Sequence, residues 1–127
     1  MANVKVHVSQ QAPAPIGPYS QAVEVNGLMF CSGQIPLDPV SGAMVGTTVA
    51  EQAEQVMANI KAVLASADLT LASVVKTTIF LTDMADFQAV NEVYAKHMGA
   101  TKPARSTIAV LALPKGSKVE IEVLAAR

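Results

Sequence analysis

The sequence predicts an α+β domain in which a mixed sheet of about six strands packs both of its helices on one face. Two segments carry apolar residues at helical spacing, and several β-branched runs alternate with turn signals. Their order along the chain is β-β-β-α-β-α-β-β. A length of 127 residues is typical of one domain, so we expect a single domain over 1–127.

The two predicted helices have recognisable ends. The first covers Thr48–Ala67, and its first residue forms a capping box with Glu51. The second begins at Asp83 or Asp86, either of which can cap it, and ends near Met98. Both have an apolar stripe that must be buried against the sheet.

The strands are predicted from β-branched and alternating runs. Asn26-Gly27 is a strong hairpin signal, and a Pro-Lys-Gly turn at 114–116 predicts a second hairpin near the C-terminus. Helices between strands favour crossover connections, whereas hairpins are antiparallel, so the sheet should be mixed. The expected strands are Lys5–Val8, Ser20–Val25, Leu28–Ser32, Val74–Leu81, Ser106–Leu111 and Lys118–Leu124.

The composition predicts an oligomer. Apolar residues make up 51% of the chain and charged residues 15%, against roughly 25% charged in a typical domain. That balance excludes intrinsic disorder. The second face of the sheet also carries apolar residues, and nothing remains in the chain to cover it. We expect subunit contacts on that face.

Charge and cysteine content exclude several function classes. The net charge is −1, with no basic stripe for nucleic acid. One cysteine excludes an intramolecular disulfide, a thiolate zinc cluster and an iron–sulfur site. No apolar run is long enough to span a membrane, and no signal peptide is apparent, so a cytoplasmic location is expected. No phosphate-binding glycine motif suggests a cofactor.

Three residues with reactive side chains have ordinary structural interpretations. His7 and His97 lie near the ends of predicted elements and are expected to be exposed surface residues. Cys31 falls within an apolar run, where a buried and inert thiol is expected because no activating base is apparent.

Two pairs of residues near the C-terminus suggest chemistry. Arg105 and Thr107 share one face of a strand, and a guanidinium beside a hydroxyl is a good carboxylate receptor. The alternative is a surface arginine at a strand start. Glu120 and Glu122 also share a strand face. They form either a solvated edge or, if that face lines an interface, a source of a general base.

Four other residues are candidates for a binding site. Tyr19 follows a Gly-Pro turn, and its hydroxyl is expected to bond to the backbone. Ser32 and Gly33 end a strand where a backbone N–H can approach a ligand closely, although an ordinary turn explains them as well. Asn91 is polar on an apolar stripe and is expected to hold a neighbouring backbone segment.

Taken together, six sequence blocks resemble the RidA/YjgF family, the reactive intermediate (enamine/imine) deaminases. They occur in the right order along nearly the whole chain, which makes the combined signal strong. The blocks are Ile16–Ala22, Ser32–Pro39, Val74–Met84, Asn91–Tyr94, Pro103–Ser106, and Leu113–Gly116 followed by Val119–Glu122.

The resemblance implies a chorismate-mutase-like fold and a homotrimer with sites in the clefts between subunits. It implies that Arg105 grips the substrate carboxylate and that Glu120 orients or activates the attacking water. The substrates would be 2-aminoacrylate or 2-aminocrotonate and their imines, 2-iminopropanoate and 2-iminobutanoate, hydrolysed without a metal or organic cofactor. The residues expected to line or support the cleft are Tyr19, Ser32, Gly33, Thr107 and Asn91.

Two other functions stay open at this point. The same cleft could bind small carboxylates without catalysis, as in a regulatory trimer. An endoribonuclease activity is ascribed to some members of the family. It fits this chain poorly, because phosphodiester cleavage requires an acid–base pair and cationic stabilisation that the sequence does not cluster.

Overall fold

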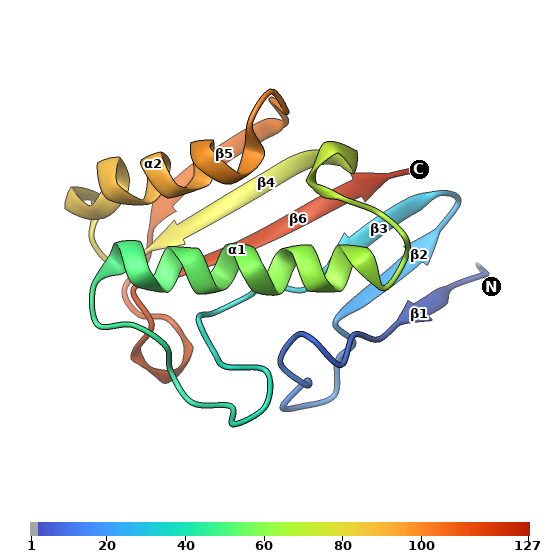
Figure 1. The fold of residues 1–127 in the computed structure, drawn as a ribbon, viewed down its shortest axis with the longest axis horizontal. Coiled ribbons are helices and arrows are strands. Elements are labelled where there is room, and N and C mark those ends of the chain that lie inside the picture. The colour runs from blue at the N-terminus through green and yellow to red at the C-terminus, as the bar shows by residue number, and fades with distance from the viewer. Residues whose placement is uncertain (1–2) are drawn as a thin grey trace.

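The computed structural model describes residues 3–127 and confirms the α+β class. A six-stranded mixed sheet has the order β1-β2-β3-β6-β4-β5, and both helices cover one face of it (Figure 1). The strands are β1 (Lys5–His7), β2 (Ala22–Val25), β3 (Leu28–Cys31), β4 (Val74–Leu81), β5 (Ala104–Ala109) and β6 (Val119–Ala126); the helices are α1 (Val49–Ala65) and α2 (Phe87–Met98).

The C-terminal strand β6 lies in the middle of the sheet rather than beside its predecessor. It pairs antiparallel with both β3 and β4, while β4 and β5 pair parallel across the α2 connection. The predicted hairpin of the last two strands is therefore wrong. The Pro-Lys-Gly turn, Pro114–Gly116, instead lies in the connection that leads from the edge strand β5 past β4 to the centre of the sheet. The Asn26-Gly27 hairpin is confirmed, with both residues at positive φ.

The helix ends follow local chemistry. Thr48 caps α1 and accepts a bond from the Glu51 amide at 3.2 Å, and the Glu51 carboxylate accepts from the Thr48 amide at 3.0 Å. This confirms the predicted capping box. Before α2, Asp83 caps a short 3₁₀ turn instead of the helix itself, and Asp86 makes no side-chain cap bond.

The core lies between the helices and the sheet. In β4 and β6, alternate residues are buried, and Ile79 faces Ile121 across the ladder. The helices cover them with fully buried side chains such as Met57 and Leu64 of α1 and Val90 of α2. The residues of β4 and β6 that alternate with these buried ones, including Glu120, point to the opposite face of the sheet.

The opposite face of the sheet is apolar and uncovered in the single chain. The exposed fractions are 55% for Val6, 46% for Phe30 and 46% for Ile108, on three different strands. Burial of such side chains is favourable by about 25 cal/mol per Å². This is the face on which the composition predicted subunit contacts.

A buried amide holds the long loop between β3 and α1. Asn59 is fully buried in α1 and donates through Nδ2 to the carbonyls of Ile35 at 3.3 Å and Leu37 at 3.0 Å. Its Oδ1 accepts from Gln55 at 2.9 Å. The loop is thereby fixed against the helix, although it contains no helix or strand of its own.

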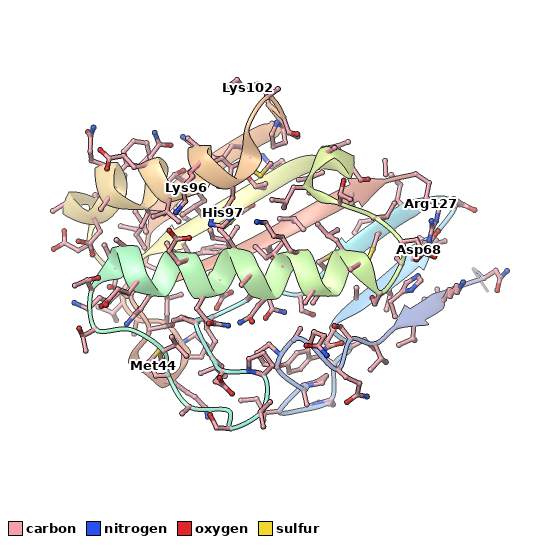
Figure 2. All side chains as sticks on the ribbon, in the orientation of Figure 1. Met44, Asp68, Lys96, His97, Lys102 and Arg127 are labelled. Atoms are coloured by element: carbon pink, nitrogen blue, oxygen red, sulfur yellow. The ribbon has the colours of Figure 1, made fainter. Side chains whose placement is uncertain are left out.

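Both histidines are more buried than expected, because each pairs with a glutamate. His7 is 6% exposed and its Nε2 lies 2.8 Å from Glu24, which also forms two hydrogen bonds to Arg127. His97 Nε2 lies 2.5 Å from Glu54, so this pair links α2 to α1. Figure 2 labels His97 between the two helices and Arg127 at the opposite end of the sheet.

Glu24 predicts a pH dependence of stability. Hydrogen bonds from Arg127 and His7 lower the pKa of Glu24 from 4.5 to about 2. A carboxyl with a lowered folded-state pKa stabilises the fold above pH 4.5 and loses that contribution as the pH falls toward 2. Glu24→Gln should therefore flatten the acid limb of thermal stability measured between these values.

The matched control is Glu92→Gln, which makes the same change at an exposed glutamate of α2. An acid limb as steep in Glu24→Gln as in the wild type would contradict the assignment.

Candidate functional site

A cavity of about 380 Å³ opens where β3 ends and β6 begins. Four residues predicted to belong to the site line it: Tyr19, Ser32, Gly33 and Glu120. The rest of its wall is largely apolar and comes from loops, including Pro13, Ile16, Ile35, Leu37 and Pro114. A cavity with apolar walls and a few convergent polar groups is the usual form of a small-molecule site.

The centre of this cavity is a close contact between Gly33 and Glu120. A Cβ on Gly33 would lie 2.4 Å from Glu120 Oε2 and 2.9 Å from its Cδ, so the carboxylate occupies the space that a side chain would need. The amides of Ser32 and Gln34 bond to backbone carbonyls, but the Gly33 amide makes no such bond within residues 3–127. The site thus places an available N–H donor beside a carboxylate.

The environment of Glu120 increases its affinity for a proton. Burial raises the pKa of Glu120 above its usual value, and the neighbouring negative charge of Glu122 raises it further. A carboxylate of raised pKa is a stronger base than one in water. This property suits a group that takes a proton from a water molecule.

Tyr19 and Ser32 use their hydroxyl groups to shape the wall. Ser32 Oγ donates to the carbonyl of Ser20 at 2.6 Å. The Tyr19 hydroxyl accepts from the Ile16 amide at 3.3 Å, which confirms its predicted bond to the backbone. Tyr19 is 51% exposed and therefore remains available for contact with a ligand or a second chain.

A second cluster surrounds Arg105 on the helix side of the sheet. Its Nη1 donates to Asn91 Oδ1 at 2.7 Å, and its guanidinium stacks over Tyr94 at 5.0 Å and Phe87 at 5.6 Å from the ring centres. The Tyr94 hydroxyl bonds to Thr77 at 2.9 Å. Asn91 was expected to hold backbone, but it orients the guanidinium instead, because its helical position faces β5.

Thr107 lies on the same strand face as Arg105, as the alternation of side chains along a strand predicted. Its Oγ1 is buried and has no hydrogen-bond partner among the residues that the structure describes. Thr107 lines neither the Glu120 cavity nor the hollow beside Asn91, Tyr94 and Arg105. In the single chain Arg105 is therefore paired with Asn91, and the carboxylate receptor of Arg105 and Thr107 stays a prediction.

The two clusters do not meet within one chain. Arg105 is level with Thr77 in the sheet, whereas Glu120 is level with Phe80, and β4 separates β5 from β6. With about 4.8 Å between strands and about 3.3 Å per residue, the Cα atoms of Arg105 and Glu120 lie roughly 14 Å apart. Their side chains point to opposite faces, so a small ligand cannot contact both.

Comparison with known protein families identifies the family of this chain. The family model described as Endoribonuclease L-PSP matches residues 9–127. The chain belongs to the RidA/YjgF family. Solved structures in this fold include TdcF of Escherichia coli with bound serine, at a TM-score of 0.91 and 41% identity, covering 97% of this chain and 99% of the other.

Relatives of this RidA/YjgF chain carry different names. It is 55% identical to protein DfrA of Myxococcus xanthus, over 98% of this chain and 96% of the relative. It is 50% identical to the chloroplastic Reactive Intermediate Deaminase A of Arabidopsis thaliana, over 92% of this chain and 63% of the relative. It is 46% identical to human 2-iminobutanoate/2-iminopropanoate deaminase, over 95% and 88% respectively.

Phe87 and Tyr94 of the arginine cluster were not among the predicted site residues. Both lie on the second helix, which was predicted from its apolar stripe. The spacing of Phe87, Asn91 and Tyr94 in the sequence does place two rings and an amide on one helix face. That this face borders Arg105 follows only from the packing of α2 against β5.

Two features are absent from residues 3–127 of this RidA/YjgF chain. No group of three or more His, Cys, Asp or Glu side chains in that range is arranged to hold a metal ion. Neither helix there combines the length and apolar character needed to cross a membrane.

The pKa of Glu120 should respond to its neighbour on the same strand. Removing the negative charge with Glu122→Gln favours the ionised form of Glu120, so the Glu120 pKa should fall toward its ordinary value while remaining raised by burial. Carbon-detected NMR titration of the carboxyl measures this change. A Glu120 pKa that is unchanged or higher in Glu122→Gln would refute the coupling.

Proposed function

We propose that this chain is a cofactor-independent imine deaminase that hydrolyses 2-iminopropanoate and 2-iminobutanoate to 2-oxo acids and ammonia. The observation that carries the proposal is the Glu120 carboxylate, lodged against Gly33 with a raised pKa and beside an unused backbone amide. The deaminase names of the Arabidopsis and human relatives, at 50% and 46% identity, support the same reaction.

Arg105 is suited to hold the substrate carboxylate. Asn91 takes one of its N–H groups and the rings of Phe87 and Tyr94 fix its plane, so the guanidinium is oriented before a ligand arrives. The remaining N–H groups form a fork that matches a carboxylate. Preorganisation of this kind lowers the entropy lost on binding.

The complete site needs two chains. Because Arg105 and Glu120 lie on opposite faces of one sheet, the guanidinium that serves a given Glu120 comes from a neighbouring copy. The exposed apolar face of the sheet supports such an assembly. We propose a homotrimer with its sites between subunits, in which each chain contributes one cluster to each of two sites.

The chemistry follows from these positions. Glu120 takes a proton from water while the water oxygen attacks the imine carbon, and the C=N electron pair moves to nitrogen, which gains a proton. The resulting carbinolamine collapses as the C–N bond breaks, ammonia leaves with a further proton, and the hydroxyl becomes the C=O group. One imine and one water give one 2-oxo acid and one ammonia.

A non-catalytic carboxylate-binding trimer is the second candidate. The solved E. coli TdcF structure is described with bound serine, an amino acid rather than an imine. The family model's description as an endoribonuclease receives less support from this site. No histidine is among the residues that line the Glu120 cavity, and both histidines of residues 3–127 pair with glutamates elsewhere.

A coupled assay tests the deaminase proposal. A serine or threonine dehydratase generates the imine, semicarbazide traps it, and the wild-type chain should compete with the trap. Arg105→Ala should lower kcat/KM by about 100-fold, because charge-assisted bonds to the carboxylate are lost. Arg105→Lys retains the charge without the fork and should remain at least tenfold below wild type, on the order expected for one lost bond.

Binding of 2-oxobutanoate, measured alongside, separates the two candidate functions. Binding without any suppression of trapping would replace the deaminase with the carboxylate-binding protein. Wild-type activity in Arg105→Lys would contradict a two-bond grip on the carboxylate.

Gly33→Ala tests the close contact at the centre of the site. Gly33 is not at positive φ, so alanine is compatible with its backbone, but the new Cβ would displace the flexible end of Glu120. The variant should unfold within a few degrees of wild type, yet lose about 100-fold in kcat/KM, the cost typical of a misplacement of about 1 Å. Full activity in a folded Gly33→Ala would show that the Glu120 position is unimportant.

A further inference from the structure

Thr77 is the polar member of the buried side of β4. Four residues of this strand are less than a tenth exposed, and the other three are Val74, Ile79 and Leu81. A valine has nearly the shape of a threonine and would pack here without needing a hydrogen-bond partner. A buried hydroxyl costs free energy unless it is bonded, so the role of Thr77 depends on its partner.

The partner of Thr77 is the hydroxyl of Tyr94. The two oxygens lie 2.9 Å apart, and neither hydroxyl forms another hydrogen bond within residues 3–127. Thr77 is 1% exposed and Tyr94 is 7% exposed. Replacement of both members of such a pair by apolar residues of the same shape typically changes stability little. The pair is therefore explained better by the orientation that it gives to the Tyr94 ring than by a gain in stability.

The bond to Thr77 fixes the Tyr94 ring against Arg105. Tyr94 extends from α2 and its hydroxyl ends on β4, so the ring is held at both ends. Thr77 is level with Arg105 of the parallel strand β5 and faces the same side of the sheet. The Arg105 guanidinium lies 5.0 Å from the centre of this ring, and its Nη1 donates to Asn91. A chain of contacts thus connects the interior of the sheet to the guanidinium.

We propose that Thr77 is a positioning residue for the substrate carboxylate, acting on Arg105 through the Tyr94 hydroxyl. This inference rests on the proposed deaminase function. Arg105 is exposed on the edge strand, and a long exposed side chain loses rotamer freedom when it binds a ligand. A restrained Tyr94 ring removes part of that freedom in advance. Thr77 lines neither the Glu120 cavity nor the hollow beside Arg105, so its effect is indirect.

The expected effect of Thr77 is on KM rather than on kcat. The substrate carboxylate takes no part in bond making or breaking, so Arg105 holds it equally well in the ground state and in the transition state. Loss of such uniform binding raises KM and leaves kcat unchanged. The affinity for 2-oxobutanoate, which carries the same carboxylate, should fall by the same factor.

Thr77→Val and Thr77→Ser together test the proposal. Thr77→Val keeps the shape and removes the hydroxyl, so KM in the trapping assay should rise about fivefold, the size of one modest hydrogen bond. Thr77→Ser keeps the hydroxyl and removes a buried methyl group, so it should lower the unfolding temperature but leave KM within about twofold of wild type. A KM that follows stability instead of the hydroxyl, with Thr77→Ser impaired as much as Thr77→Val, overturns the proposal.

The double variant Thr77→Val with Tyr94→Phe removes the effect of an unpaired buried hydroxyl. It should unfold at or above the wild-type temperature, because no polar group of the pair is left without a partner, and yet it should keep the raised KM. A wild-type KM in this folded variant would show that the hydroxyl pair does not position Arg105.

Arg105→Ala provides the matched background. If Thr77 acts only through Arg105, Thr77→Val should change kcat/KM by less than about twofold once the guanidinium is absent, since the two substitutions are then not additive. A fivefold loss that persists in Arg105→Ala would assign Thr77 a structural role unrelated to the arginine.

The two proposals fail in different ways. If the wild type binds 2-oxobutanoate but does not suppress trapping, the deaminase function fails, and Thr77 is judged by the oxo acid affinities of Thr77→Val and Thr77→Ser measured by calorimetry. If the wild type neither binds nor suppresses trapping, both proposals are overturned.

Discussion

The contact between Gly33 and the Glu120 carboxylate is the constraint on which the candidate site depends. The carboxylate lies where any other residue would place its Cβ, and this position both shields it from water and brings it next to a backbone N–H. The contact exists because β6 pairs with β4 on one side, while Ile121 of β6 pairs with Gln34, just beyond β3, on the other. The arrangement of the sheet therefore sets the chemistry of Glu120, through burial that raises its pKa.

The loops around this contact are positioned by the core rather than by regular structure of their own. Loops carry function when a rigid scaffold holds them, and here buried side-chain amides provide the attachment. From the buried face of α1, Asn59 binds the carbonyls of Ile35 and Leu37 in the cavity wall, and Gln52 binds the Lys118 amide just before β6. One helix thus packs the core and fixes the cavity wall.

The division of the site into two clusters links catalysis to assembly. Arg105 is fixed by α2 on the covered face of the sheet, and Glu120 belongs to the opposite face, which is apolar and exposed. A chain with this division has a reason to associate that goes beyond burial of apolar surface. In the proposed trimer the same contacts that cover the open face also complete each site, so loss of assembly would remove activity without damage to either cluster.

Local patterns in the sequence determined the element types, most of their limits, the capping box at Thr48 and the hairpin at Asn26, because these depend on neighbouring residues alone. They also determined which residues share a strand face. Tertiary structure decided the rest. The central place of β6, the pairing of both histidines with glutamates, and the bond between Asn91 and Arg105 join residues distant in sequence. Periodic patterns in the sequence do not predict such pairings, because the energy of each pairing depends on which faces and loops meet after the chain has folded.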